Sequence, residues 1–403
     1  MTTIADIEAP GPGPTPAQAR ERRDHRGSWI PTWGMVATRL MELRKRRGLM
    51  IALIAVNVGI PVIFLGVRLI SHAVDSKAYG PAGGYAVFTG LVAGFMYIFG
   101  FIVAAVVGST AGSVDLTEGM FRHLVITGRS RLAVYLARIP AGLAIVISLV
   151  AVGYTIVCAV CVFAAPTQLN YDGVVVPQGL SRPALDNWAA AHADKVICDF
   201  NFGGGKGLNG PPPSVPCGNG QSSGPPPGSV IQTKRGTITV PASESPAEIR
   251  AFAVRVANQD YADYHATFIT PSYSLMIDVG LWIALEATIG FIVGLGLSSL
   301  MGQRTVPVIL LIVLELILTP LFSRTIISHL LNAERGIVGI AMAHIEPGGL
   351  PTPFGGGGPF GGGNGGGGPP LIPESTLAAS LVIVGWLVFW TAIGAWRMMK
   401  RDA

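Results

Sequence analysis

The chain has 403 residues, half of them hydrophobic and only 13% charged, with a mean hydropathy of +0.52 and a net charge of +5. A soluble domain carries about one-quarter charged residues, so this composition excludes an ordinary soluble protein and indicates an all-α polytopic membrane protein. We assign the small positive charge to the membrane surface and expect no nucleic-acid partner.

Six stretches are apolar enough to cross a bilayer, which takes about 20 residues as a helix. Backbone polar groups inside lipid must be paired within the segment, so each stretch is predicted to be a transmembrane helix. The six predicted spans cover 49–67, 85–107, 140–162, 275–300, 306–322 and 376–396.

Basic residues indicate the orientation of the spans. The short loop over 71–84 contains one lysine, Lys77, and no arginine. The flanks on the other side of the spans contain many of both. By the positive-inside rule both termini are expected in the cytoplasm, and two large loops are expected outside. The basic flanking residues are Arg39, Arg44, Lys45, Arg46, Arg47, Arg122, Arg129, Arg131, Arg138, Arg304, Arg397, Lys400 and Arg401.

The first apolar run begins only at Gly48 and is too long for a cleavable signal peptide. The predicted division of the chain is therefore a disordered cytoplasmic tail over 1–28, an amphipathic interfacial helix over 29–47, spans one to three over 48–164 with a cytoplasmic hinge over 108–138, an extracytoplasmic loop over 165–273, spans four and five over 274–322, a second outer loop over 323–375 with a Gly/Pro-rich tract, span six over 376–397 and a cytoplasmic tail over 398–403.

The first outer loop contains local structure signals. Ser245, Pro246 and Glu248 form a helix start, with Ile249, Phe252, Val256 and Ala257 on one face, and the stretch over 230–240 predicts a hairpin.

Four cysteines divide between this loop and the third span. An oxidising compartment permits a disulfide between Cys198 and Cys217. Cys158 and Cys161 lie in the third span, where we expect packing rather than redox chemistry.

The hinge between spans two and three is charged and amphipathic. Met120, Phe121, Leu124 and Val125 recur at helical spacing, which predicts a short element with one apolar face. Such a face can lie on lipid headgroups or bind a soluble partner, and its residues alone leave both interpretations open.

An ordered set of motifs resembles the permease subunits of type-2 ABC exporters. The set comprises ELRKRR over 42–47, the hinge with Glu118-Gly119, Arg122-His123-Leu124 and Thr127-Gly128-Arg129-Ser130-Arg131, and the terminal RMMKRDA. The resemblance covers the membrane core but neither the N-terminal tail nor the two outer loops. This chain has Gly128 where the family often has proline, and its outer loop after span three is long, which limits inference about the substrate.

The resemblance implies a coupling helix in the hinge, which docks on a separate ATPase through Glu118, Met120, Phe121, Arg122, Leu124 and Arg131. It implies that the helix over 33–47 lies on the membrane, with Trp33, Val36, Ala37, Leu40 and Leu43 toward lipid. It also implies a second permease subunit, identical or different, and a loop over 325–343 that dips back into the membrane.

The sequence lacks the G-x-x-x-x-G-K-[ST] phosphate loop, so ATP and magnesium are expected on the partner subunit and no cofactor on this chain. No catalytic or metal site is expected either. The nearest constellation comprises His192, Asp194, Asp260, Asp263 and His265, and it lacks zinc-type spacing.

Three acidic residues lie within the predicted spans. Glu286 and Glu315 are near the middle of theirs, whereas Asp278 is near the outer end of the fourth. A carboxylate at mid-membrane is costly and suggests a cavity or gate, although a hydrogen bond between packed helices is the simpler interpretation. Asn57, with Pro61, suggests either a kink or ordinary packing in the first span.

Three functional hypotheses follow. The first is a plasma-membrane permease of a bacterial exporter that moves a hydrophobic or amphipathic solute outward. The second is a membrane scaffold or sensor whose outer loops bind a ligand or envelope partner. The third, a secondary transporter, should show an internal repeat, and none is visible.

Overall fold

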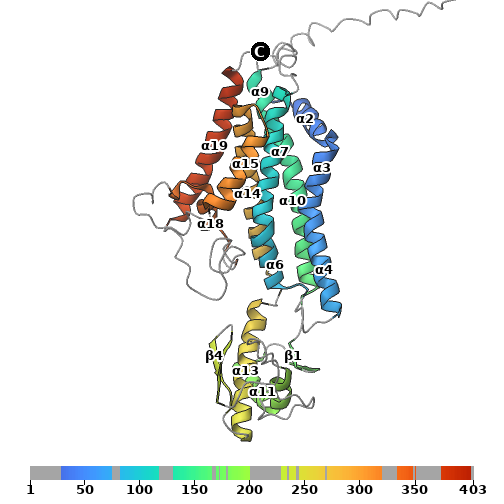
Figure 1. The fold of residues 1–403 in the computed structure, drawn as a ribbon, viewed down its shortest axis with the longest axis vertical. Helices are drawn as coiled ribbons and strands as arrows, with labels where there is room; N and C mark the ends of the chain where they lie inside the picture. Colours follow the sequence, from blue (N-terminus) through green and yellow to red (C-terminus); the bar gives the residue numbers. More distant parts are fainter. Residues whose placement is uncertain are drawn as a thin grey trace, which may run out of the picture.

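The computed structural model describes most of the predicted spans and the larger part of the first outer loop (Figure 1). The described part is mostly helical, with long helices in an elongated bundle and a smaller domain beyond one end. The described residues are 29–74, 82–117, 130–165, 169–171, 173–177, 180–199, 228–233, 236–241, 245–267, 270–319, 334–347, 350 and 374–400.

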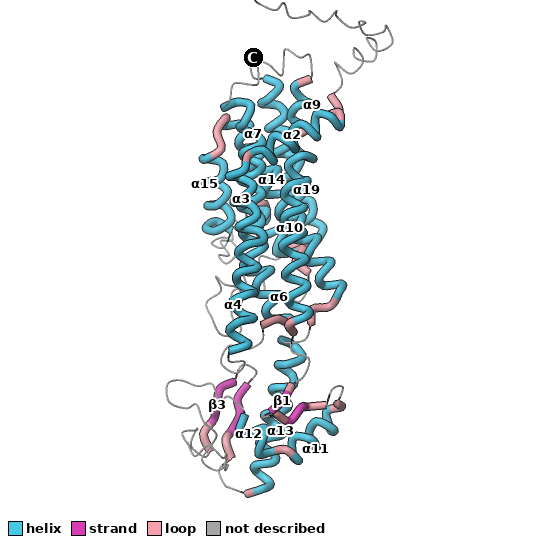
Figure 2. The backbone as a smooth tube through the Cα atoms, turned by 90° about the vertical axis from the view of Figure 1, so that its right-hand side faces the viewer, coloured by secondary structure: helices cyan, strands magenta, loops and turns pink. Residues whose placement is uncertain are grey.

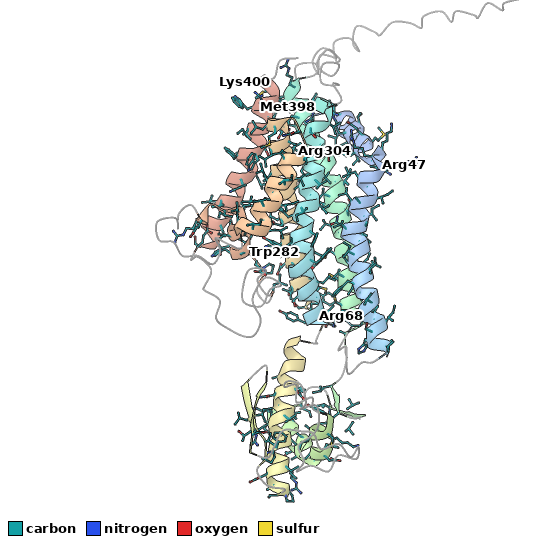
Figure 3. All side chains as sticks on the ribbon, in the orientation of Figure 1. Arg47, Arg68, Trp282, Arg304, Met398 and Lys400 are labelled. Carbon is teal, nitrogen blue, oxygen red and sulfur yellow. The ribbon has the colours of Figure 1, made fainter. Side chains whose placement is uncertain are left out.

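The two ends of the bundle differ in charge. Arg47, Arg304 and Lys400 lie at the end that we call the basic end, whereas Arg68 lies near the opposite one (Figure 3). The first described helix and the C-terminus both lie at the basic end (Figure 1). The smaller domain lies beyond the other end, which we call the domain end. A bundle with its cationic side chains on one side is the pattern that the positive-inside rule describes.

Five helices in the described part are long and apolar enough to cross a membrane. They match predicted spans one to four and six, and they cover Arg47–Val74, Val87–Val114, Arg131–Phe163, Tyr273–Met301 and Thr376–Lys400.

The predicted fifth span is described only in part. It corresponds to the apolar helix Thr305–Leu318, roughly 21 Å long at 1.5 Å per residue, against a bilayer core of about 30 Å. Residues 320–333 lie outside the described part. The structure therefore supports five spans, and the sixth stays a prediction.

The N-terminal helix is bent away from the first span. Helix α2 (Trp33–Lys45) ends at Arg46, whose φ of −78° and ψ of 75° are not helical. The span follows as α3 (Arg47–Ile54), a π-helical turn η1 (Ala55–Gly59) and α4 (Ile60–Val74).

The apolar side of α2 was wrongly predicted to face lipid at two positions. Val36 is buried against Ala137 and Ala141, and Leu43 belongs to the bundle core. Trp33, in contrast, is 82% exposed. Helical spacing identifies an apolar face, but it does not distinguish lipid from a neighbouring helix, and here part of that face packs on the start of the third span.

Two helices form the centre of the bundle with unusually close backbones. The second span comprises α6 (Tyr85–Leu91), the π-helical turn η2 (Val92–Met96) and α7 (Tyr97–Thr117), and the fourth span is α14 (Tyr273–Met301). A Cβ atom added to Gly290 or to Gly294 would lie 2.5 Å from the backbone oxygen of Phe101 or of Ala105, respectively. Small residues allow helices in lipid to pack this closely.

The remaining helices surround this pair. They are α9 (Arg131–Leu136), α10 (Arg138–Phe163), α15 (Thr305–Val313), the π-helical turn η3 (Leu314–Leu318), α18 (Val338–His344) and α19 (Thr376–Lys400). Trp282 of α14 donates a hydrogen bond from Nε1 to the carbonyl of Met342, at 3.1 Å. Trp386 of α19 donates likewise to the carbonyl of Gly336, at 2.8 Å. The two tryptophans therefore fix the α18 segment between α14 and α19.

The first loop forms a domain with its own core, which we call the loop domain (Figure 2). The predicted hairpin over 230–240 is confirmed, with Val230 paired to Thr239 and Thr233 to Gly236. The helix predicted after Ser245 is also confirmed. The expectation of an all-α chain therefore holds for the bundle but not for this domain, whose elements are β1 (Asn170–Tyr171), β2 (Val174–Val175), α11 (Arg182–Ala191), α12 (Ala193–Asp199), β3 (Val230–Thr233), β4 (Gly236–Thr239) and α13 (Pro246–Thr267).

Candidate functional site

The central part of the predicted coupling hinge, residues 118–129, lies outside the described residues, and it includes Glu118, Met120, Phe121, Arg122 and Leu124. Its C-terminal flank is described. The Ser130 side chain accepts a hydrogen bond from the Ala133 amide at 3.1 Å and caps α9. Arg131 donates from Nη1 to the carbonyl of Met399, also at 3.1 Å. The flank is thereby joined to the last turn of α19 at the basic end.

Arg138 is buried, although it lies in a basic flank of the spans. Only 2% of it is exposed, and Nη1 donates to the carbonyl of Gly112 at 3.1 Å. A small cavity separates it from Arg39 and Glu42 of α2, which form an ion pair at 2.6 Å. A guanidinium removed from water needs such acceptors, so Arg138 joins α10 to α7 where α2 meets both.

Asn57 performs a packing role in the first span. It lies in the π-helical turn η1, is 6% exposed, and donates from Nδ2 to the carbonyl of Leu53 at 3.0 Å. Its own carbonyl lies against Gly153 of α10, where a side chain would not fit. The polar group is therefore satisfied within its own helix while the backbone packs closely on the neighbour.

Glu286 and Glu315 form an intramembrane acidic pair. Each is 1% exposed, and neither carboxylate has a hydrogen-bond partner in the part of the chain that the structure describes. Glu286 lies on α14 and Glu315 lies in η3, and the two side chains interact electrostatically between these elements. Glu286 lies roughly 20 Å along α14 from Tyr273, near the middle of that helix.

Tyr97 brings a third carboxylate into this group. Tyr97 follows the π-helical turn η2, is 1% exposed, and interacts electrostatically with Glu286, Glu315 and Glu346. We call these three glutamates the acidic cluster. Of the four groups, Glu315 lies in a π-helical turn and Tyr97 directly follows another, and such turns often occur where a helix is adapted to a functional site.

Glu346 lies outside the spans, directly after α18. Burial raises the pKa of its carboxyl group to about 8. Neither of its oxygens has a hydrogen-bond partner among the described residues. The acidic cluster thus contains a group that changes charge near neutral pH.

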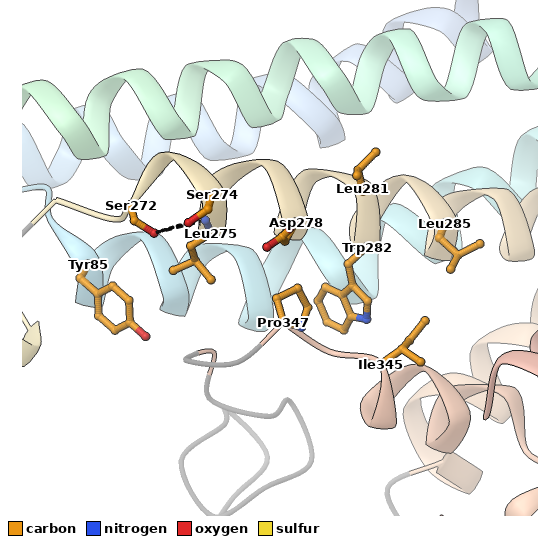
Figure 4. A pocket seen from close by; sticks show the side chains of 10 residues that line it. All are labelled: Tyr85, Ser272, Ser274, Leu275, Asp278, Leu281, Trp282, Leu285, Ile345 and Pro347. Carbon is orange, nitrogen blue, oxygen red and sulfur yellow. Dashed lines mark hydrogen bonds between the residues drawn. The ribbon is translucent and has the colours of Figure 1, made fainter. Parts of the chain in front are cut away.

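A pocket of about 670 Å³ opens beside the cluster at the domain end of α14 (Figure 4). Trp282 forms part of its wall and stacks on Tyr97, with ring centroids 4.5 Å apart and planes at 12°. Its lining comprises Tyr85, Ser272, Ser274, Leu275, Asp278, Leu281, Trp282, Leu285, Ile345 and Pro347.

The pocket and the cluster were only partly visible in the sequence. Glu286, Glu315 and Asp278 were identified there, whereas Tyr97, Trp282 and Glu346 were missed. One signal was available, because Asp278, Trp282 and Glu286 recur every four residues and so share one face of a helix. The other members come from distant segments, and only the fold brings them together.

The cysteines and histidines of the loop domain serve its structure. Cys198 is disulfide-bonded, and its predicted partner Cys217 lies outside the described residues. Cys158 and Cys161 are free thiols on α10.

Among the described residues, no three His, Cys, Asp or Glu side chains converge as metal ligands would. His192 Nδ1 lies 2.9 Å from the carbonyl of Trp188, and Asp260 accepts a hydrogen bond from the Tyr171 hydroxyl at 3.0 Å. Both side chains therefore take part in contacts within the loop domain.

The fold and these sites define a class, a mostly helical protein of multi-pass membrane architecture with an added loop domain. Comparison of the chain with known protein families, curated proteins and solved structures found no match.

Proposed function

We propose that this chain is the membrane-spanning permease subunit of an ATP-driven ABC exporter that moves a hydrophobic or amphipathic solute outward. The observation that carries the proposal is the gathering of α2, the end of α7, the start of α9 and the end of α19 at the basic end (Figure 1). The predicted hinge over 108–138 includes the end of α7 and the start of α9, which both lie at this end. A soluble ATPase that docks there contacts the segment that the family resemblance assigns to coupling.

Two arginines connect the hinge to three spans. Arg131 binds the carbonyl of Met399 on α19, and Arg138 on α10 binds the carbonyl of Gly112 on α7. A displacement of the hinge is therefore transmitted to α7, α10 and α19 through charge-assisted hydrogen bonds as well as through the backbone.

The proposal specifies the surroundings of the chain. The basic end faces the cytoplasm, both termini lie there, and the stretch over 306–322 is the remaining span of the six. ATP and magnesium bind the partner ATPase, and a second permease subunit completes the transporter in a bacterial plasma membrane.

A second candidate, a membrane scaffold or sensor, is favoured by the loop domain. This domain buries a core of its own, and its helix α13 leads into α14 within a few residues. A ligand bound by the loop domain would act on the central helix of the bundle without any ATPase.

Affinity purification in mild detergent, followed by mass spectrometry, distinguishes the two candidates. The permease proposal expects a stoichiometric ATPase with a phosphate loop to accompany the chain. Changing Phe121→Ala together with Glu118→Ala should remove this ATPase while the chain still reaches the membrane. The matched control is Phe163→Ala, at the domain end of α10, where the side chain is 88% exposed.

Either of two results would overturn the permease proposal. One is a chain that purifies without any ATPase under conditions that preserve a known exporter. The other is an ATPase that stays bound to the double hinge variant and is lost from Phe163→Ala, which would move the docking site to the opposite end.

A further inference from the structure

The walls of the pocket are mostly apolar and aromatic. Leucine side chains at positions 275, 281 and 285 come from α14, and Ile345 and Pro347 come from the segment after α18. Tyr85 and Trp282 add aromatic rings, as the close-up shows (Figure 4). A volume of about 670 Å³ lies within the range of about 300–1,000 Å³ that is typical of sites for small molecules.

The charge of this region is negative. Asp278 is an exposed member of the lining, and the described lining residues include neither lysine nor arginine. Glu346 stands between two residues of the wall, and Glu286 lies two turns beyond Asp278 on the same face of α14. A negative field with no opposing charge in the wall favours a cation and disfavours an anion.

Two further acidic side chains lie buried near this pocket. Glu286 and Glu315 are both 1% exposed, and neither forms a hydrogen bond within the described part of the chain. Tyr97 stacks on Trp282 and interacts electrostatically with all three glutamates of the acidic cluster, so the aromatic wall of the pocket and this cluster have Tyr97 in common. Each ring can place its face toward a positive charge.

We infer that this pocket binds an amphipathic organic cation, with its apolar body against the leucine wall and its positive group between Asp278 and Trp282. Lipid-soluble anions and fatty acids are disfavoured by the same carboxylates. A divalent metal is a poor occupant, because no three suitable ligands converge among the described residues.

The inference rests on the proposed function only where it names the class of solute that would be exported. Binding itself needs neither ATP nor a partner. Binding is therefore measured with the full chain alone. A failure to bind the probe would leave the permease proposal intact. A failure to find a partner ATPase would leave the binding site intact.

Tetraphenylphosphonium and tetraphenylborate are suitable probes, because they share one shape and carry opposite charges. Equilibrium dialysis measures each labelled probe against the full chain in phosphatidylcholine nanodiscs, with empty nanodiscs subtracted. We expect the cation to bind saturably, and at least tenfold more tightly than the anion. The expected preference for the cation follows from the single sign of the charges around the pocket.

The variant Asp278→Asn tests the location of the site. Asp278 is exposed and asparagine has nearly the same shape, so the fold should be retained. We expect the affinity for the cation to fall about tenfold while the weak binding of tetraphenylborate does not decrease. The matched control, Glu248→Gln, removes one charge from an exposed position in the first turn of α13 and should change neither affinity.

Three results would overturn the inference. The first is equal binding of the two probes, which would show partition into apolar surface only. The second is an unchanged affinity for the cation in Asp278→Asn, which would place the site elsewhere. The third is equal losses in Asp278→Asn and Glu248→Gln, which would show a general effect of net charge.

Discussion

The two halves of α14 differ in what they bury. Toward the basic end, every residue from Ile289 to Ser299 is buried, and the polar side chains of this stretch are the two small serines at its end. Toward the domain end, Tyr273, Ile277 and Leu281 are each more than 60% exposed, and Asp278 lies in a pocket. The first half packs against protein on every side, whereas the second half packs on one side only.

One half of α14 is built for close helix packing, and the other half leaves room for a ligand. Close backbone contact in the basic half requires glycine at the points where the two helices touch, and it leaves no space for a ligand. Glu286, near the junction of the halves, buries two carboxylate oxygens that have no hydrogen bond among the described residues. A helix that packs closely in one half and buries an unpartnered carboxyl group beside a pocket in the other is stabilised in the first half and adapted to function in the second.

The largest expected effect comes from adding one methyl group to the packed half. In Gly294→Ala the new Cβ atom would lie 2.5 Å from the carbonyl oxygen of Ala105, and neither backbone can move without shifting a whole helix. We expect a loss of roughly 3 kcal/mol in the free energy of unfolding. Thermal unfolding of the purified chain in detergent measures this change.

The control is Gly385→Ala on α19, because the structure places nothing within 4 Å of an added Cβ atom there. This control should be neutral or slightly stabilising, since alanine favours a helix over glycine. If both variants lost stability equally, the close contact between α7 and α14 would not be a source of stability.

The next effect has the opposite sign. Glu286→Met replaces a buried carboxyl group with an apolar side chain of similar length. We expect the free energy of unfolding to rise by about 2 kcal/mol, because the cost of burying the unpartnered group disappears. The same thermal measurement applies, and transport or solute-stimulated ATPase activity should fall.

Glu286→Gln keeps the shape and a polar head, so its gain in stability should be smaller than that of methionine. A marked loss of stability in both variants would contradict the comparison of the two halves, because it would show that Glu286 stabilises the bundle as firmly as the glycines do.

A smaller effect concerns pH and the domain half. The pKa of Glu346 is raised to about 8 by burial, so its carboxyl group becomes neutral as the pH falls through that value. A neutral group attracts a cation less, so the affinity for tetraphenylphosphonium should be highest above about pH 8 and about threefold lower at about pH 6. Equilibrium dialysis at a series of pH values measures this change in affinity.

Other titratable groups lie near Glu346, so the assignment needs a variant. They are Tyr97 on α7, Glu286 on α14, Glu315 in η3, His344 on α18 and Asp278 in the pocket. Glu346→Gln should remove most of the pH dependence while it lowers the affinity at high pH. An unchanged profile in this variant would assign the titration to another member of this group.

The smallest effect is expected where the packed half carries a polar group that is already satisfied. Ser298 is fully buried, and its hydroxyl donates to the carbonyl of Leu295 at 3.2 Å. Ser298→Ala removes the whole hydroxyl group, so no unpaired hydroxyl is left buried. The expected loss in the free energy of unfolding is therefore below about 1 kcal/mol. A larger loss in thermal unfolding would indicate that the hydroxyl also binds across to α7.

The membrane helices and two parts of the loop domain were predictable from local sequence. The first predicted span over 49–67 lies within Arg47–Val74, because mean hydropathy averages over a whole helix and needs no knowledge of neighbours. The strand pairing of Val230 with Thr239 and the start of α13 follow from turn and cap residues next to them.

The pocket, the acidic cluster and the burial of Arg138 were not predictable in this way. Arg138 resembles any other arginine in a basic flank until Gly112 of α7 is placed beside it. Glu346 lies about 60 residues after Glu286 in a loop, and only the position of α18 against α14 brings it near Tyr97. These features depend on which segments meet, and hydropathy contains no information about that.

The π-helical turn η3 has a consequence in genetic terms. Such a turn contains one residue more than an α-helical turn, so an in-frame deletion of a single codon within Leu314–Leu318 restores a regular helix instead of breaking it. Because the wider turn accommodates the extra residue, the helix on either side of the deletion keeps its orientation, and only the residues within the turn change the direction in which they point. Such a deletion should give a folded, full-sized product in which Glu315 no longer points toward Glu286.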